Sequence, residues 1–205
     1  MLFTYIISNL YQLNEYYKTQ KCIDLEYIII NPDTSYWNSG NIHKIHNTIN
    51  KLLFNIVHCN INIRTIQLEN RLLELLSCKE VPTKYLLELQ KINNNKLVVL
   101  LVNNIQKRKG CYYDEGLIII GWNSGYLATK DLDETRLRSE TLAHEILHSG
   151  QLQHIKCKNN NDKKNHPNLM FTNDDKCFRD RYRTEINQKQ KDKFLSNSKF
   201  VYSCG

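Results

Sequence analysis

The chain has 205 residues, of which 41% are hydrophobic and 24% are charged, and its formal net charge is +7. This length and composition predict one globular domain with a buried core, and they exclude a disordered chain. No apolar run approaches the ~18 residues that cross a bilayer, so we expect no membrane span. The positive charge allows an acidic partner such as nucleic acid. Lysine-rich surface loops explain that charge more simply, and we expect a monomer.

The cysteines are scattered along the chain and contain no CxxC pair, which argues against a structural zinc site built from them. The apolar start, residues 1–10, lacks the basic region and the cleavage site of a signal peptide. An odd number of cysteines then favours reduced thiols and a cytoplasmic location. Secretion is the alternative, and in that case a Cys157–Cys177 disulfide could form. The seven cysteines are Cys22, Cys59, Cys78, Cys111, Cys157, Cys177 and Cys204.

The first half of the chain alternates between helical and extended patterns. Residues 1–20 mix apolar and polar side chains and predict a short helix or an ordered arm. A β-branched run over 25–30 ends at a turn and predicts a strand. Isoleucine and leucine at helical spacing predict an amphipathic helix over 41–58. Alternation over 60–67 predicts a second strand, and 70–91 has a helical pattern.

The second half begins with a continuous apolar run over 96–102, which predicts a central strand covered on both faces. A loop is expected over 107–110 and another strand over 117–120. The following helix, which Asp131 or Asp133 can cap, carries the motif described next. A last helix is predicted over 184–196.

The motif is His144-Glu145-Ile146-Leu147-His148, with a further histidine at His154. Residues four apart lie on one face of a helix, so His144 and His148 can bind one ion. Three imidazoles suit Zn²⁺ and leave a fourth position for water. Glu145 can hold and deprotonate that water, so HExxH with a third histidine is a signature of zinc hydrolases.

The chain resembles the metzincin clan of zinc peptidases. The histidines have the spacing of that clan, and Asn168-Leu169-Met170-Phe171 follows them as a candidate for the Met-turn of the clan. The segments before the motif are similar to the strand, loop and edge strand of metzincins. The predicted last helix is similar to the helix that follows the Met-turn.

The resemblance implies an α+β, zincin-like fold. We expect the 96–103 strand at the centre of a twisted mixed sheet and the 116–121 strand at its edge, where an extended peptide can add. Helices 41–58 and 134–149 are expected on one face of this sheet. The single domain over 1–205 would comprise an N-terminal arm to residue 24, an upper part to residue 155 and a lower part.

The resemblance also implies a zinc-dependent endopeptidase acting on a protein or peptide substrate. His144, His148 and His154 would bind Zn²⁺, and Glu145 would be the general base and acid. Metzincins have glycine where this chain has Gln151, and that glycine provides a left-handed turn. We expect Gly150 to provide this turn one residue earlier.

Several alternatives stay open. His166 could replace His154 as the third ligand, and Glu185 could be a carboxylate ligand, although its surroundings predict a solvated helix start. Cys22 could mask the zinc as a thiolate, but an ordinary thiol is the simpler interpretation. Two other function classes are a DNA-repair protease of the WLM type, which shares the histidine spacing, and a catalytically silent zincin-like binding module, which would be expected to lose Glu145.

Overall fold

The computed structural model describes residues 20–68, 95–105, 109–113, 116–123, 133–155, 168–171 and 184–204. Its centre is a mixed sheet with the strand order β2-β1-β3-β5-β4. Strands β1, β2, β3 and β5 pair in parallel, whereas β4 runs antiparallel to β5. The short strand β6 pairs antiparallel with the start of β1. The strands are β1 (Lys21–Ile30), β2 (His58–Ile66), β3 (Leu97–Val102), β4 (Gly110–Tyr113), β5 (Leu117–Gly121) and β6 (Tyr202–Ser203).

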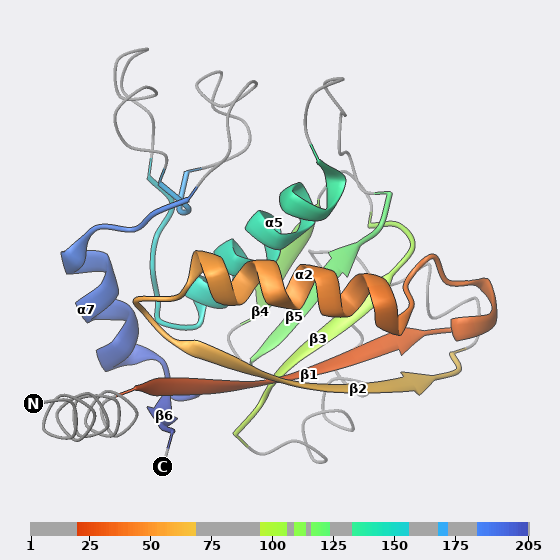
Figure 1. Cartoon of the computed structure of the whole chain (residues 1–205), viewed down its shortest axis with the longest axis horizontal. Coiled ribbons are helices and arrows are strands. Elements are labelled where there is room, and N and C mark those ends of the chain that lie inside the picture. Colours follow the sequence, from red (N-terminus) through yellow and green to blue (C-terminus); the bar gives the residue numbers. More distant parts are fainter. Residues whose placement is uncertain are drawn as a thin grey trace, which may run out of the picture.

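Within the described residues, three α-helices accompany the sheet: α2 (Ser39–Leu52), α5 (Glu134–His148) and α7 (Gln188–Asn197). Helices α2 and α5 lie over the same face of the sheet, as predicted (Figure 1). The apolar side of α2, including Ile42, Ile45 and Ile49, joins Leu142 and Ile146 of α5 in one core. A second apolar cluster lies on the other face of the sheet. Burial on both faces explains the uninterrupted apolar sequence of β3.

The strand at the edge of the sheet differs from the prediction. Strand β3 is central, as expected, but β5 lies between β3 and β4 and is therefore not an edge strand. All five residues of β5 are buried, as its apolar sequence favours for a strand covered on both sides. The edge strand on this side is β4. The loop expected over 107–110 overlaps it only at Gly110, and no element was predicted for 111–113.

Two helices differ from their predicted bounds. Helix α2 ends at Leu52 rather than near 58, and His58 begins β2. The Asn50 side chain bonds the backbone N–H and C=O of Cys59, and so joins the end of α2 to β2. Helix α7 begins at Gln188 rather than 184, because Asn187 caps it and forms a capping box with Gln190.

The predicted segments 1–19 and 70–91 lie outside the described residues. Among the described helices, none is long and apolar enough to cross a membrane.

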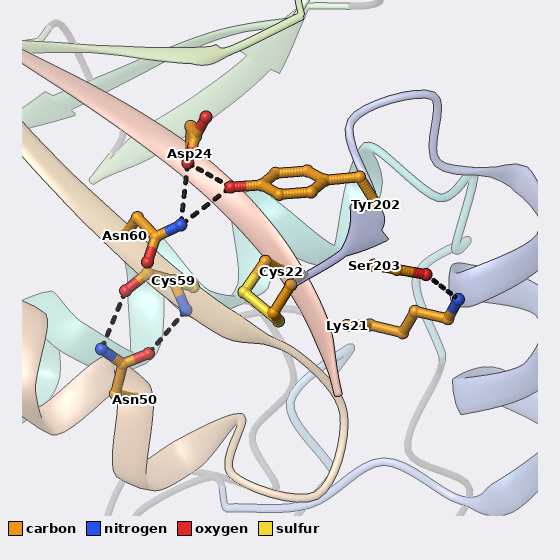
Figure 2. The surroundings of a disulfide bond; sticks show 9 residues. Lys21, Cys22, Asp24, Asn50, Cys59, Asn60, Tyr202 and Ser203 are labelled. Carbon is orange, nitrogen blue, oxygen red and sulfur yellow. Dashed lines mark hydrogen bonds between the residues drawn. A yellow bond between two sulfur atoms is a disulfide. The ribbon is translucent and has the colours of Figure 1, made fainter. Parts of the chain in front are cut away.

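The C-terminal strand is covalently attached to the first strand. Cys22 and Cys204 form a disulfide, with their Cα atoms 5.2 Å apart. Figure 2 shows that polar contacts surround it: Lys21 donates to Ser203, and the Tyr202 hydroxyl donates to Asp24 at 2.6 Å. The expectation of reduced thiols is therefore wrong for this pair, and Cys22 is no thiolate ligand.

Two other cysteines are described. Cys111 is also disulfide-bonded, which contradicts the same expectation. Cys59 is a free, buried thiol, and burial raises its pKa to about 12. The Cys157–Cys177 disulfide considered for a secreted protein lies outside the described residues. The expectation failed because pairs far apart in the sequence leave no local spacing signal.

Candidate metal centre

Helix α5 carries the histidine motif and is held in place along most of its length. Asp133 caps it by accepting from the Thr135 N–H at 2.9 Å, as the sequence favoured. Residues 138–147 are all buried. The buried guanidinium of Arg138 lies 3.8 Å from the centre of the Trp122 ring and donates to the Trp122 carbonyl. A helix fixed in this way presents its C-terminal turn in a defined position.

The three predicted histidines converge at the end of this helix. Their Nε2 atoms form a triangle with sides of 3.0 Å (His144 to His154), 3.1 Å (His144 to His148) and 3.0 Å (His148 to His154). Within the described part of the chain, these residues form the one group of three or more potential ligands that could hold a metal ion. His144 is buried, His148 half-buried and His154 exposed. The cluster therefore opens towards solvent on the His154 side.

Backbone carbonyls determine the tautomer of two of the rings. His144 Nδ1 lies 2.6 Å from the Leu169 carbonyl, and His148 Nδ1 lies 2.7 Å from the Leu152 carbonyl. A carbonyl only accepts, so each Nδ1 must carry the proton, and each Nε2 lone pair points into the cluster. Burial lowers the pKa of His148 to about 4. The ring is therefore neutral at neutral pH, which is the state that binds metals.

Strand β4 lies against the site and contributes two residues, Gly110 and Tyr112, for which no role at the site was predicted. Gly110 faces α5 so closely that an added Cβ would lie 3.3 Å from Glu145 Cγ and 3.1 Å from Thr141 Cγ2. The Tyr112 ring stacks on His148, with centroids 6.5 Å apart and planes 22° apart. The predicted general base, Glu145, is buried and lies between α5 and β4. The glycine directly before Cys-Tyr-Tyr was the available signal for this approach.

The turn after the helix does not use Gly150 as expected. Gln151 adopts the left-handed conformation, with φ of 58°, whereas Gly150 does not. This reversal brings the Leu152 carbonyl to His148 and His154 into the cluster. Gly150 is needed for space, because an added Cβ would lie 2.6 Å from the backbone Cα of Phe194 in α7. The chain therefore separates two functions, close packing at Gly150 and backbone reversal at Gln151.

We expect Gln151→Gly to raise the free energy of unfolding by about 0.5–1 kcal/mol, because glycine adopts the left-handed conformation without a Cβ clash. Urea unfolding of the metal-free protein measures this change. Gly150→Ala is the matched control and should lower stability by about 1–3 kcal/mol through the clash with α7. A loss of stability in Gln151→Gly would show that the glutamine side chain, and not the backbone conformation, matters at this position.

The candidate Met-turn forms a compact turn beside the histidines. Leu169, Met170 and Phe171 are buried. The Met170 N–H donates to the Asn168 side chain at 2.8 Å, and the Ile155 N–H donates to the Met170 carbonyl at 2.9 Å. The turn thus joins the segment that carries His154 and supplies the carbonyl that holds His144.

Of the alternative ligands, Glu185 is described and is not part of this cluster. The Glu185 side chain is exposed, and its backbone carbonyl accepts from the Leu169 N–H at 2.7 Å. His46 is buried between the Tyr27 hydroxyl and the Asn50 amide, and burial lowers its pKa to about 4. It is therefore a histidine of the core and not a member of the metal centre. His166 lies outside the described residues.

The fold resembles that of zinc peptidases. No protein-family model and no curated protein matches this chain. A zinc-dependent peptidase from Methanocorpusculum labreanum superimposes with a TM-score of 0.56 at 15% identity, over 82% of this chain and 99% of that chain. Archaemetzincin (amzA) from Methanopyrus kandleri superimposes with a TM-score of 0.55 at 13% identity, over 85% and 94%. At these identities the likeness establishes the mixed α/β fold with its twisted sheet.

Proposed function

We propose that this protein is a zinc-dependent endopeptidase of the metzincin type, in which His144, His148 and His154 bind the ion. The observation that supports this most is the convergence of three Nε2 atoms within 3.0–3.1 Å of one another. Bonds of about 2.0–2.1 Å in a tetrahedral zinc site place two nitrogens about 3.3 Å apart, so the three rings fit this ion with small adjustments. Two of the three rings, His144 and His148, are also held by carbonyls at Nδ1, as is usual for histidines that bind zinc.

When bound at these histidines, zinc supplies Lewis acidity and a water of lowered pKa. Glu145 follows the first ligand directly, and we assign it the transfer of protons. Its carboxylate takes the proton of the water as the water oxygen bonds to the scissile carbonyl carbon. As the carbon–nitrogen bond breaks, Glu145 delivers that proton to the leaving amine. The presence of this glutamate supports an active peptidase over a silent binding module.

The substrate we propose is an extended peptide that runs past the end of α5. The terminal strand β4 approaches Glu145 through Gly110 and stacks Tyr112 on His148. This strand takes the place beside the site that was predicted for 117–120.

The likeness to a structure named archaemetzincin favours the metzincin type over the WLM alternative. The disulfides favour an oxidising compartment, and so the secreted alternative over a cytoplasmic location.

The proposal is tested by removing and restoring the metal. Protein treated with a chelator and then dialysed should not cleave casein, an unstructured substrate. One equivalent of Zn²⁺ per chain should restore cleavage, because three histidines and one water complete a four-coordinate site. Mg²⁺ is the control and should not restore it, since this ion prefers oxygen ligands. Unchanged cleavage by the metal-free protein would contradict the proposal.

A further inference from the structure

The carbonyl that holds His144 belongs to a turn whose shape is set by one side chain. The Asn168 amide oxygen accepts from the Met170 N–H at 2.8 Å, across the residue that supplies the carbonyl. The Leu169 carbonyl then lies 2.6 Å from His144 Nδ1. Rotation of the Asn168 amide would break its bond to the N–H of the Leu169–Met170 peptide, and the carbonyl of that peptide is the partner of His144. The orientation of Asn168 therefore contributes to the position of the carbonyl that His144 contacts.

A residue of α7 fixes the orientation of this amide. Gln190 Oε1 accepts from Asn168 Nδ2 at 2.8 Å, and Gln190 Nε2 contacts Asn168 Oδ1 at 3.4 Å. The same Oε1 accepts from the backbone N–H of Asn187 at 2.9 Å. Because Oε1 can only accept a hydrogen bond, the NH₂ group of Asn168, and not its amide oxygen, must point towards Gln190. The amide oxygen of Asn168 is then left to bond Met170.

We propose that Gln190 is a positioning residue for the metal centre, acting through Asn168 and the Leu169 carbonyl on His144. Within the part of the chain that the structure describes, the side chain of Gln190 contacts Asn168 and Asn187 and none of the three histidines. Its effect is to hold His144 as the Nδ1–H tautomer with Nε2 facing the cluster. Removal of a group that bonds a metal ligand directly typically changes metal affinity by about 10–100-fold, and Gln190 acts by positioning such a group. The inference rests on the proposed function only for the identity of the ion.

Gln190 also belongs to the capping box of α7, so the test must separate positioning from helix stability. Asn187→Ala is the matched control, because it removes the acceptor of the Gln190 N–H at 2.9 Å and leaves the Gln190–Asn168 bond in place. Gln190→Glu is the conservative variant. A carboxylate accepts from both Asn168 Nδ2 and the Asn187 N–H, and it is favourable near a helix N-terminus.

The first measurement is the tautomer of His144 in the metal-free protein, read from the ¹⁵N shifts of its ring in an NMR spectrum at neutral pH. We expect a single Nδ1–H tautomer in the wild type, Gln190→Glu and Asn187→Ala. Gln190→Ala should show loss of this single tautomer. The second measurement is zinc affinity by chelator competition, in which Gln190→Ala should bind about 10–100-fold more weakly and the other variants should match the wild type.

Two results would overturn the inference. One is a Gln190→Ala protein with the wild-type tautomer and affinity. The other is an Asn187→Ala protein that loses both as Gln190→Ala does, which would assign the effect to helix stability alone. A wild-type protein that binds no zinc would contradict the proposed function instead. The tautomer measurement needs no metal, so it would still decide the role of Gln190.

Discussion

Glu145→Gln should lower the rate of casein cleavage by about 10²–10⁴-fold, which is the range for the loss of a general acid–base group. Glutamine has the size of glutamate but cannot take the proton of the attacking water. It should fit the buried space between α5 and β4 without displacing Gly110. Because Glu145 is not one of the three clustered ligands, zinc content should stay at the wild-type value.

Glu134→Gln is the control for this variant. It removes a carboxylate from the same helix at its first turn, where Glu134 is exposed and pairs with Arg138, and cleavage should not change. Both variants are compared with the wild type by zinc content and by the initial rate on casein. Wild-type cleavage by a Glu145→Gln protein would falsify the proposed mechanism, because that mechanism assigns the proton transfer to Glu145 alone.

Removal of the Cys22–Cys204 disulfide should have the largest effect on stability. The two cysteines are 182 residues apart in the sequence. Closing a loop of that length restricts the unfolded chain, and the chain-entropy model gives a stabilisation of about 5 kcal/mol. We expect Cys22→Ser with Cys204→Ser to lose stability of that order. The hydrogen bonds of Tyr202 and Ser203 remain, but they no longer have a covalent link to support them.

Unfolding in urea without reductant measures this effect. A reductant is unsuitable because Cys111 is also disulfide-bonded. Each single replacement already breaks the cross-link, so Cys22→Ser and Cys204→Ser should each lose nearly as much as the pair, a strong departure from additivity. Additive losses, with the pair losing twice as much as either single variant, would show that side-chain packing rather than the covalent link stabilises this end of the chain.

The sequence predicted the histidine cluster because its signal is local. His144 and His148 lie four residues apart on a helix, and helix geometry alone brings them together. His154 follows closely enough for a single turn to return it to the same point. Strand β3 could be recognised for a similar reason, since burial on both faces requires a continuous apolar run.

Features that depend on distant contacts could not be predicted in the same way. Strand β5 is not at the edge of the sheet because β4 pairs with it on the outer side. Strand β4 could not be predicted, because Gly110 to Tyr113 is too short a segment to show alternation. Gln151 adopts a conformation that favours glycine, and only the space taken by Phe194 shows why the glycine is at 150 instead. The bond between Gln190 and Asn168 joins residues 22 apart in the sequence. No residue pattern in either segment indicates it.

The central claim is that His144, His148 and His154 bind one zinc ion, and zinc content per chain tests it most directly. It is measured on purified wild-type protein, on the three single alanine variants and on His166→Ala, after dialysis against buffered zinc. We predict one zinc per chain in the wild type and in His166→Ala, and loss of zinc in His144→Ala, His148→Ala and His154→Ala. Retention of zinc by His154→Ala together with its loss from His166→Ala would contradict the ligand set, and a wild-type protein without zinc would contradict the whole account.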